Sequence, residues 1–290
     1  MLNGKFVVVT GATAGIGWQA ALDLASAGAR VIGVGRSPQR CQSAQECIIQ
    51  ACPQARISFL VAELGSQAQV RRLAQEILAL VDAENTGRID VLVNNAGLSS
   101  QQRILTEDGI ERTFAVNHLA PLLLTYLLLP ALRKAVDSRV LTVSSNSHYN
   151  TWLNPKVAPN PLLYFGLWAY KVSKLGNVLF TQRFNRMMNG TPAAFAVDPG
   201  LVNTDIGLKD PSPLAQRVWR GRQKLGAPPS KPSKTILYLA QAQGLDCLKD
   251  PYWRDCKPKP ASRAAWNAGL IERTWQESCR LCGIPVEWRE

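Results

Sequence analysis

A tyrosine and a lysine four positions apart are the residues best suited to chemistry in this sequence. Residues 170–174 are YKVSK, within a helix predicted from about Trp168 to Met188. A spacing of four places Tyr170 and Lys174 on one helical face, where an ammonium can influence a phenol. Free tyrosine has a pKa of about 10, so acid/base chemistry at neutral pH needs a neighbour that favours the phenolate. The pair predicts a proton-transfer site, although a surface tyrosine beside a surface lysine gives the same pentapeptide.

A glycine-rich turn near the N-terminus predicts a phosphate-binding loop. Residues 10–17 are TGATAGIG, directly after an apolar run and before a helix expected from near Ile16 to Gly28. Gly11, Gly15 and Gly17 permit a tight turn, close approach of a pyrophosphate and packing of helix on strand, while the helix N-terminus attracts the anion. The spacing is G-x-x-x-G-x-G and not G-x-G-x-x-G.

The end of the second apolar run bears on the choice of dinucleotide. An NAD enzyme places an acidic residue there to bind the ribose 2′-hydroxyl, whereas this sequence has Gly35 followed by Arg36. An arginine can pair with the 2′-phosphate of NADP, and the missing acid removes a repulsion. The sequence predicts NADP(H), with the alternative that Arg36 is one more exposed arginine of a basic protein.

The elements that must position these residues form a repeated strand and helix pattern. Helix starts are predicted at Ser37-Pro38 and at Ser66, each with a capping side chain. Continuous apolar runs indicate strands buried on both faces of a parallel sheet. The six runs are residues 6–10, 30–35, 56–62, 90–96, 139–145 and 193–199. We predict an α/β fold with a Rossmann-like doubly wound parallel sheet, forming a single domain over residues 1–290.

Further polar residues follow the ends of these predicted strands. NNAG occupies residues 94–97, Asn117 lies in FAVNHL, and Ser144-Ser145 ends the fifth run. Open α/β sheets bind ligands at the carboxyl ends of their strands, so we expect these groups to surround one site.

Together these motifs resemble the short-chain dehydrogenase/reductase family over nearly the whole chain, up to the DPG turn at 198–200. The resemblance implies that Tyr170 is the acid/base and that Lys174 binds the nicotinamide ribose and lowers the tyrosine pKa. Ser145 would orient the substrate oxygen, because the family uses the second serine of such a pair and alternation prevents both from facing the site. Asn117 would hold a water that links Lys174 to solvent.

The same resemblance assigns the cofactor contacts. Asn94 and Ala96 would lie near the adenine ribose, and Glu63-Leu64 stands where the family often has Asp-Leu against the adenine. The residues after the sixth strand would surround the nicotinamide. The full predicted set is Gly11, Thr13, Ala14, Gly15, Ile16, Gly17, Arg36, Glu63, Leu64, Asn94, Ala96, Gly97, Tyr170, Lys174, Pro199, Gly200, Val202 and Thr204.

The region between Ser145 and Tyr170 bears on the substrate. This region resembles the retinol-dehydrogenase-like branch in its length and in its aromatic residues and prolines, and so does the tail segment YWRDCKPKPAS. Asp198, however, stands where that branch often has histidine. We expect a substrate loop at about 146–168 and interconversion of a carbonyl and an alcohol on a retinoid-like, steroid-like or other lipophilic substrate. The alternatives are reduction of a C=C bond in a polycyclic or pigment-like substrate, and a non-catalytic NADP(H)-binding scaffold or redox sensor.

Two further segments have predicted roles. Residues 201–232 are expected to form a lid, with a basic membrane-contacting face at 214–224 or a solvated basic surface as the alternatives. Residues 260–282 are expected to form a helical tail.

The amino-acid composition limits the possible partners, metal sites and cellular locations of the protein. The net charge is +12, but Lys and Arg are spread along the chain, so nucleic acid is not an expected partner. Seven cysteines without framework spacing favour a reducing compartment, and Cys279 and Cys282 alone cannot complete a metal site. The apolar residues 119–132 are too short to span a membrane and predict a core helix. With no leader pattern before Phe6 we predict a cytoplasmic protein, peripheral to a membrane if 214–224 binds one. The family resemblance implies a homodimer, although the membrane-associated branch often departs from that assembly, so the oligomeric state stays open.

Overall fold

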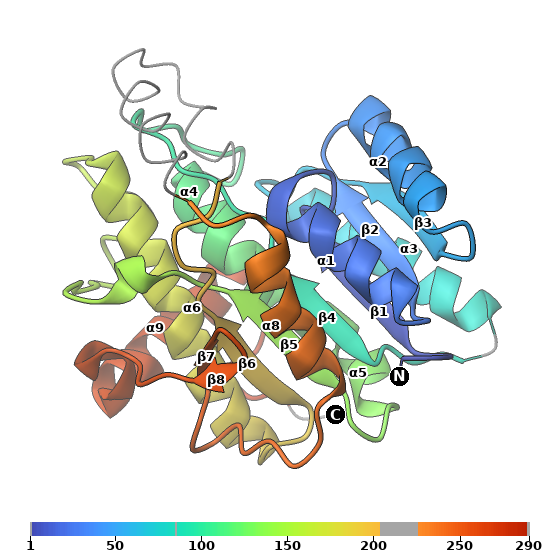
Figure 1. The fold of residues 1–290 in the computed structure, drawn as a ribbon. Helices are drawn as coiled ribbons and strands as arrows, with labels where there is room; N and C mark the ends of the chain where they lie inside the picture. The colour runs from blue at the N-terminus through green and yellow to red at the C-terminus, as the bar shows by residue number, and fades with distance from the viewer. Residues whose placement is uncertain (1, 85, 204–225, 289–290) are drawn as a thin grey trace.

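The core of the molecule is one twisted sheet (Figure 1). The computed structural model describes residues 2–84, 86–203 and 226–288. The strand order is β3-β2-β1-β4-β5-β6-β7-β8, with every neighbouring pair parallel except β7 and β8. This order confirms the predicted doubly wound α/β fold. The strands are β1 (Phe6–Thr10), β2 (Arg30–Gly35), β3 (Arg56–Val61), β4 (Val91–Asn94), β5 (Arg139–Val143), β6 (Ala193–Val197), β7 (Tyr252–Arg254) and β8 (Lys257–Pro258).

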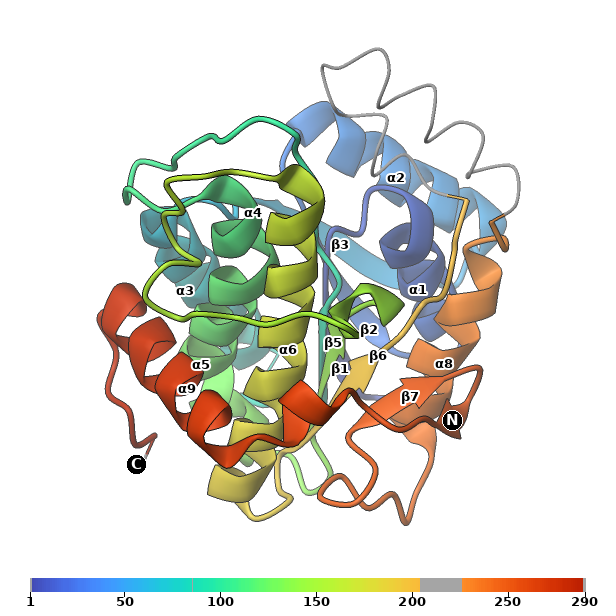
Figure 2. The same ribbon diagram turned by 90° about the vertical axis from the view of Figure 1, so that its left-hand side faces the viewer.

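Helices cover both faces of the sheet (Figures 1 and 2). One face carries α1, α2 and α8, and the other carries α3, α5, α6 and α9. The long helices are α1 (Gly15–Ser26), α2 (Pro38–Ala51), α3 (Gln67–Ala83), α5 (Ala120–Arg133), α6 (Gly166–Met188), α8 (Ser230–Gln241) and α9 (Ala268–Cys282). The short ones are α4 (Arg112–Phe114), the π-helix η1 (Ala115–Leu119) and the 3-10 helices η2 (Asn146–His148) and η4 (Arg263–Trp266).

The period of two along each strand divides the core between these faces. In β1, Val7 and Val9 pack toward α1 and α8, while Phe6 and Val8 pack toward α3 and α5. All five side chains of β1 are buried, as the continuous apolar run predicted.

The predicted helix starts have the expected capping bonds. The hydroxyl of Ser37 accepts a hydrogen bond from the amide of Arg40, with Pro38 in the first turn, and that of Ser66 accepts one from Gln69. These bonds satisfy amides that the helix itself leaves unpaired.

The apolar stretch predicted as a core helix forms α5, which continues through Pro130. Arg112–Arg133 is long and apolar enough to cross a membrane, with a mean hydropathy of 1.6. Because 83% of its most apolar window is buried inside the molecule, its hydrophobicity is explained by the core.

Three segments singled out in the sequence surround the sheet. Within the predicted substrate loop, η2 is followed by irregular chain until α6 begins at Gly166. Most of the predicted lid, including the basic segment 214–224 and Thr204, lies outside the described residues. In the predicted tail, η4 and α9 pack against α6 (Figure 2).

Candidate active site

A cavity of about 960 Å³ follows the carboxyl ends of β1, β2, β4, β5 and β6. It extends from the glycine turn before α1 to the tyrosine and lysine of α6. It brings together most of the residues predicted for the site. These are Gly11, Thr13, Ala14, Gly15, Ile16, Gly17, Arg36, Glu63, Leu64, Ala96, Gly97, Ser145, Tyr170, Lys174, Pro199, Gly200 and Val202.

One turn of α6 presents the tyrosine and the lysine to this cavity. The ammonium nitrogen of Lys174 lies 5.5 Å from the centroid of the Tyr170 ring. It donates a hydrogen bond of 2.8 Å to the carbonyl oxygen of Val143, the last residue of β5. The helix and the strand end are therefore tied together at the centre of the site.

The two serines after β5 face opposite ways. The buried hydroxyl of Ser144 donates to the carbonyl oxygen of Lys174 at 2.8 Å. Ser145 lines the cavity, where its hydroxyl interacts with the phenol of Tyr170. Alternation along the extended chain thus leaves Ser145 for the site.

Buried His148 supports the segment that carries Ser145. Its Nε2 accepts a hydrogen bond from the amide of Ser262 at 3.1 Å, so its Nδ1 carries the proton toward the carbonyl oxygen of Ser145, 2.9 Å away. Both ring nitrogens of His148 therefore pair with backbone groups, and His148 does not line the cavity.

Burial dominates the proton affinities of both groups on α6. It raises the pKa of Tyr170 to about 12, against the hydrogen bond with Ser145, which lowers it. It lowers the pKa of Lys174 to about 8. The Lys174 ammonium donates to Val143 and the phenol is itself desolvated, so burial is the largest influence on the pKa of Tyr170.

Asn117 lies behind the cavity wall, inside the π-helix η1. Its side chain is fully buried and pairs with both backbone groups of Leu98, at 2.8 and 2.9 Å, and with the hydroxyl of Ser173 at 3.0 Å. A side chain on Gly97 would come within 3.4 Å of the Asn117 amide oxygen and 3.5 Å of the Lys174 nitrogen. Asn117 therefore holds the chain after β4 against α6.

The glycine turn leaves space that any side chain would fill. A Cβ on Gly17 would lie 2.2 Å from the carbonyl oxygen of Gly11, and Gly11 has a positive φ of 66°. The side-chain amide of Asn95 donates to the carbonyl oxygen of Thr10 at 2.9 Å, and the Thr10 hydroxyl accepts from the backbone amides of Asn95 and Ala96. The ends of β1 and β4 thus form one cradle, which fits a dinucleotide pyrophosphate.

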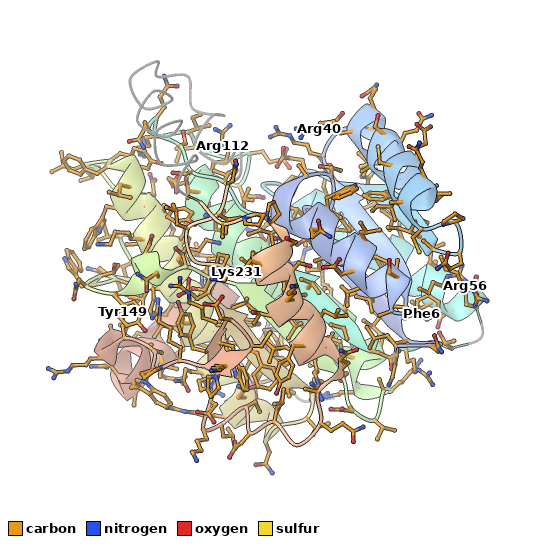
Figure 3. The ribbon with its side chains drawn as sticks, in the orientation of Figure 1. Phe6, Arg40, Arg56, Arg112, Tyr149 and Lys231 are labelled. Atoms are coloured by element: carbon orange, nitrogen blue, oxygen red, sulfur yellow. The ribbon has the colours of Figure 1, made fainter. Side chains whose placement is uncertain are left out.

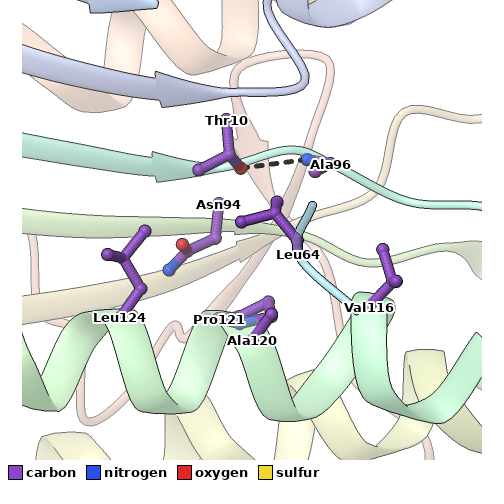
Figure 4. Close-up of a pocket in the computed structure, with 8 residues that line it drawn as sticks. All are labelled: Thr10, Leu64, Asn94, Ala96, Val116, Ala120, Pro121 and Leu124. Atoms are coloured by element: carbon purple, nitrogen blue, oxygen red, sulfur yellow. Dashed lines mark hydrogen bonds between the residues drawn. The ribbon is translucent and has the colours of Figure 1, made fainter. Parts of the chain in front are cut away.

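Asn94 is a correction to the predicted site. Its amide donates to the hydroxyl of Thr125 at 3.2 Å, on α5, and it does not line the main cavity. As Figure 4 shows, it lies in a separate narrow gap between the sheet and α5, which has no room for a water molecule. Period-two alternation places the next residue, Asn95, in the main cavity.

The far end of the cavity is basic. Arg36 lies there, 3.4 Å from the carboxylate of Glu63, together with Ser37 and Arg40 from the start of α2. Figure 3 shows the side chains of Arg40 and Arg112 at the upper side of the molecule, and both residues line the cavity. Arg40 was not predicted, although its place in the first turn of α2, four positions after Arg36, could have indicated it.

A buried carboxylate organises the other end of the cavity. Asp198 accepts hydrogen bonds from the amides of Asn146 and Gly200 at 3.1 and 3.0 Å, and pairs with Lys259 at 2.8 Å and Arg254 at 3.8 Å. Burial alone would raise its pKa, but these bonds and charges hold the pKa below its usual value. Asp198 thereby connects the segment after β5, the turn after β6 and the β7-β8 pair.

The described residues contain no group of three or more His, Cys, Asp or Glu side chains arranged to hold a metal ion. Cys279 and Cys282 are buried free thiols, and burial raises both pKa values to about 12.

Comparison with known proteins identifies related chains. The sequence model described as short chain dehydrogenase matches residues 5–212. Retinol dehydrogenase 12 of Mus musculus is 35% identical over 287 residues, covering 99% of this chain and 89% of the relative. An uncharacterized protein from Mycobacterium paratuberculosis has a solved structure with a TM-score of 0.75 and 29% identity, covering 98% of this chain and 96% of the other. A metagenomic short-chain oxidoreductase solved with NADP has a TM-score of 0.64 and 24% identity, with coverage of 87% and 97%.

Proposed function

The chain belongs to the short-chain dehydrogenase/reductase family, and on this premise we propose that it transfers hydride between NADP(H) and a carbonyl or alcohol of a hydrophobic substrate. The family and the retinol dehydrogenase relatives make it an oxidoreductase of CH–OH or C=O groups that uses a nicotinamide cofactor. NADP as the preferred form, the substrate class and the roles of the site residues are the proposal.

One observation carries the proposal. A single cavity joins a glycine cradle for a pyrophosphate to Ser145, Tyr170 and Lys174 at its other end. A binding scaffold would need the cradle but would have no use for a buried phenol next to a hydroxyl and an ammonium. We therefore favour catalysis over the scaffold and sensor alternatives.

The residues divide the proton chemistry among them. NADPH, when bound, supplies the hydride. Tyr170, which stays protonated at neutral pH, donates its phenolic proton to the carbonyl oxygen as that oxygen gains charge. Ser145 orients the same oxygen, and Lys174 replaces the proton and holds the nicotinamide ribose. In oxidation of an alcohol the proton moves the other way, with the phenolate as base.

The preference for NADP follows from this chain's own residues. Arg36, Ser37 and Arg40 together offer two guanidinium groups and a hydroxyl at the adenine end of the cavity. Guanidinium groups bind phosphate through paired hydrogen bonds. An acidic residue in place of Gly35 does not fit, since its Cβ would lie 2.4 Å from Thr13 and 2.6 Å from Cys41.

The catalytic end of the cavity favours an apolar substrate. Leu98, Val143, Leu167, Leu201 and Val202 line it around Tyr170. Such a surface desolvates the reacting carbonyl and binds a hydrocarbon body without requiring polar partners. We therefore propose a retinoid-like, steroid-like or other lipophilic aldehyde, ketone or alcohol as substrate.

Location and assembly complete the proposal. All seven cysteines are free in the structure, which supports a reducing compartment such as the cytoplasm. The predicted membrane contact at 214–224 lies outside the described residues and stays a prediction. A homodimer also stays a prediction.

The proposal is tested by steady-state assay of NADPH and NADH oxidation with a panel of hydrophobic aldehydes, ketones and enones. Wild type should turn over carbonyl substrates with NADPH, and Tyr170→Phe should lose about 10³-fold in kcat while still binding NADPH. Tight NADPH binding without turnover on the panel would favour the sensor. Turnover restricted to the enones' C=C bond would favour the alternative reduction.

A further inference from the structure

The segment between η2 and α6 exposes a set of large apolar side chains. Leu162 is 96% exposed and Leu163 is 82% exposed, and four further large apolar side chains of the segment are 48–70% exposed. Soluble proteins rarely display such a concentration of apolar side chains without a partner. We call this set the apolar rim, and its members are Trp152, Val157, Leu162, Leu163, Phe165 and Leu167.

The chain beneath the apolar rim is firmly held. The Tyr164 hydroxyl lies 2.8 Å from the carbonyl oxygen of Ser100 and 3.1 Å from the carboxylate of Glu111. Gly166 approaches the same strand of chain so closely that a Cβ there would lie 2.1 Å from the Ser100 oxygen. Tyr164 and Gly166 thus face inward, and Leu163, Phe165 and Leu167 alternate with them and face outward. The exposure is a consequence of fixed geometry.

The apolar rim borders the mouth of the cavity. Leu167 is both exposed and part of the cavity lining, less than one helical turn before Tyr170. Figure 2 shows the segment passing along the outer side of the molecule and returning to the first turn of α6. A ligand held at the apolar rim therefore lies next to the entrance of the site.

The charged side chains of the rim segment itself are all basic, and the nearest carboxylates come from other elements, Glu277 of α9 near Lys156 and Glu111 at Tyr164. No Asp or Glu occurs between Asp137 and Asp198, while the rim segment itself carries exposed Lys156 and is followed by Lys171. The whole chain has a net charge of +12. In a two-fold contact between copies, these lysines would approach each other with no carboxylate of the segment to pair with. Anionic lipid headgroups, in contrast, complement them.

We propose that the apolar rim inserts into the headgroup boundary of an anionic lipid bilayer, with Lys156 and Lys171 against the headgroups. The contact differs from the basic segment predicted from sequence and uses other residues. Resting on the proposed function, it gives a lipophilic substrate a path from the bilayer to Tyr170 without crossing water.

Flotation of the full chain with vesicles tests this proposal. Wild type should float with phosphatidylcholine vesicles that contain phosphatidylserine, more than with phosphatidylcholine alone, and added salt should weaken the effect. Leu162→Asp/Leu163→Asp should reduce the bound fraction at least about tenfold. These side chains are solvent-exposed, so the variant is expected to fold, which circular dichroism checks. Val136→Asp, a matched change at a 94% exposed residue before β5, should leave binding unchanged.

The outcomes separate this proposal from the proposed function. Wild type that fails to float with either vesicle, or a double variant that floats as well as wild type, would overturn the bilayer contact. A wild-type dimer that the double variant converts to a monomer, without vesicle binding, would replace the bilayer by a second copy. Turnover of a water-soluble aldehyde by wild type is measured separately without vesicles, so a failure of catalysis would be recognised independently of flotation.

Discussion

At the residue scale, the buried ammonium of Lys174 gives the site a group that titrates near neutral pH. Its pKa of about 8 has one cause, which is desolvation in the wall between α6 and β5. The same burial keeps Tyr170 protonated over the whole physiological range. Tyr170, the proposed proton donor, is thus protonated at every physiological pH. Lys174, which is proposed to return the proton to Tyr170, is not.

This difference predicts the pH profile of carbonyl reduction. We expect kcat/KM to fall about tenfold per pH unit above about 8, as Lys174 loses its proton. Unfolding does not explain such a fall, because a lysine whose folded pKa lies below its unfolded value makes the fold more stable as pH rises from about 8 to 10.5. Lys174→Arg, which keeps its charge, should remove the break near pH 8. A wild-type profile that is flat from pH 7 to about 9.5 would contradict the assignment.

The basic end of the cavity predicts cofactor selectivity. Arg36→Ala and Arg40→Ala should each raise KM for NADPH about 10- to 100-fold, since a charge-assisted hydrogen bond contributes roughly 1.5–3 kcal/mol. KM for NADH should change by less than about twofold, as NADH lacks the 2′-phosphate. Arg56→Ala, an exposed arginine at the start of β3 and labelled in Figure 3, is the matched control. An equal rise of KM for NADPH and for NADH would show that these arginines do not bind the 2′-phosphate.

Most of the residues that the sequence predicted for the site line one cavity, because motifs and backbone geometry coincide. Gly11 and Gly17 belong to the glycine-rich turn and Tyr170 to the YKVSK helix, and the backbone geometry of both motifs is nearly fixed. Asn94 was misplaced because a one-residue difference reverses which side of a strand end a side chain faces. The state of Tyr170 depends on burial among distant segments, which spacing along one helix does not encode.

At the scale of elements, β7 and β8 illustrate the same limit. The six strands predicted from apolar runs are present, but these two are three and two residues long and carry no such run. Their formation depends on pairing with β6 and on the contact of Arg254 and Lys259 with Asp198, residues 56 and 61 positions apart in sequence. Contacts over such separations are not visible in local sequence.

The Asp198 cluster predicts a link between stability and catalysis. Asp198→Asn keeps the shape but leaves Lys259 and Arg254 without their shared anion, so we expect a loss of about 2–4 kcal/mol in free energy of unfolding. The Ser145 segment should loosen as well, because Asn146 loses a charge-assisted bond. Urea unfolding and kcat measure the two effects. Asp255→Asn removes an exposed carboxylate that also contacts Arg254 and should cost little; similar losses in both variants would count against a special role for Asp198.

At the scale of the whole molecule, the C-terminal helix α9 completes the core. It packs on α6 and contacts α5, where Trp275 and Trp288 meet Phe180 and Phe184. Figure 2 shows α9 lying along these helices. Aromatic packing therefore joins the C-terminal segment to α6, the helix that carries Tyr170 and Lys174.

Buried His118 connects this packing to pH. Its Nε2 lies 2.9 Å from the hydroxyl of Ser278 on α9, and burial, partly offset by Asn177, lowers its pKa to about 4. A histidine that is neutral in the fold stabilises it above its unfolded pKa of 6.5, and this stability is lost as pH falls toward 4. Full loss corresponds to roughly 3 kcal/mol. His118→Gln should therefore show a shallower fall in free energy of unfolding between pH 6.5 and 4 by urea titration, and parallel curves would refute this role.

Hydride transfer to a carbonyl carbon is the central claim, and isotope transfer tests it most directly. NADPH carrying deuterium at both C4 positions would be incubated with a turned-over hydrophobic aldehyde or ketone, and the product analysed by mass spectrometry and proton NMR. The account predicts one deuterium on the carbinol carbon with wild type, and about 10³-fold slower formation of the same labelled product with Tyr170→Phe. Deuterium on a saturated carbon away from the oxygen, or an unlabelled alcohol, would contradict it.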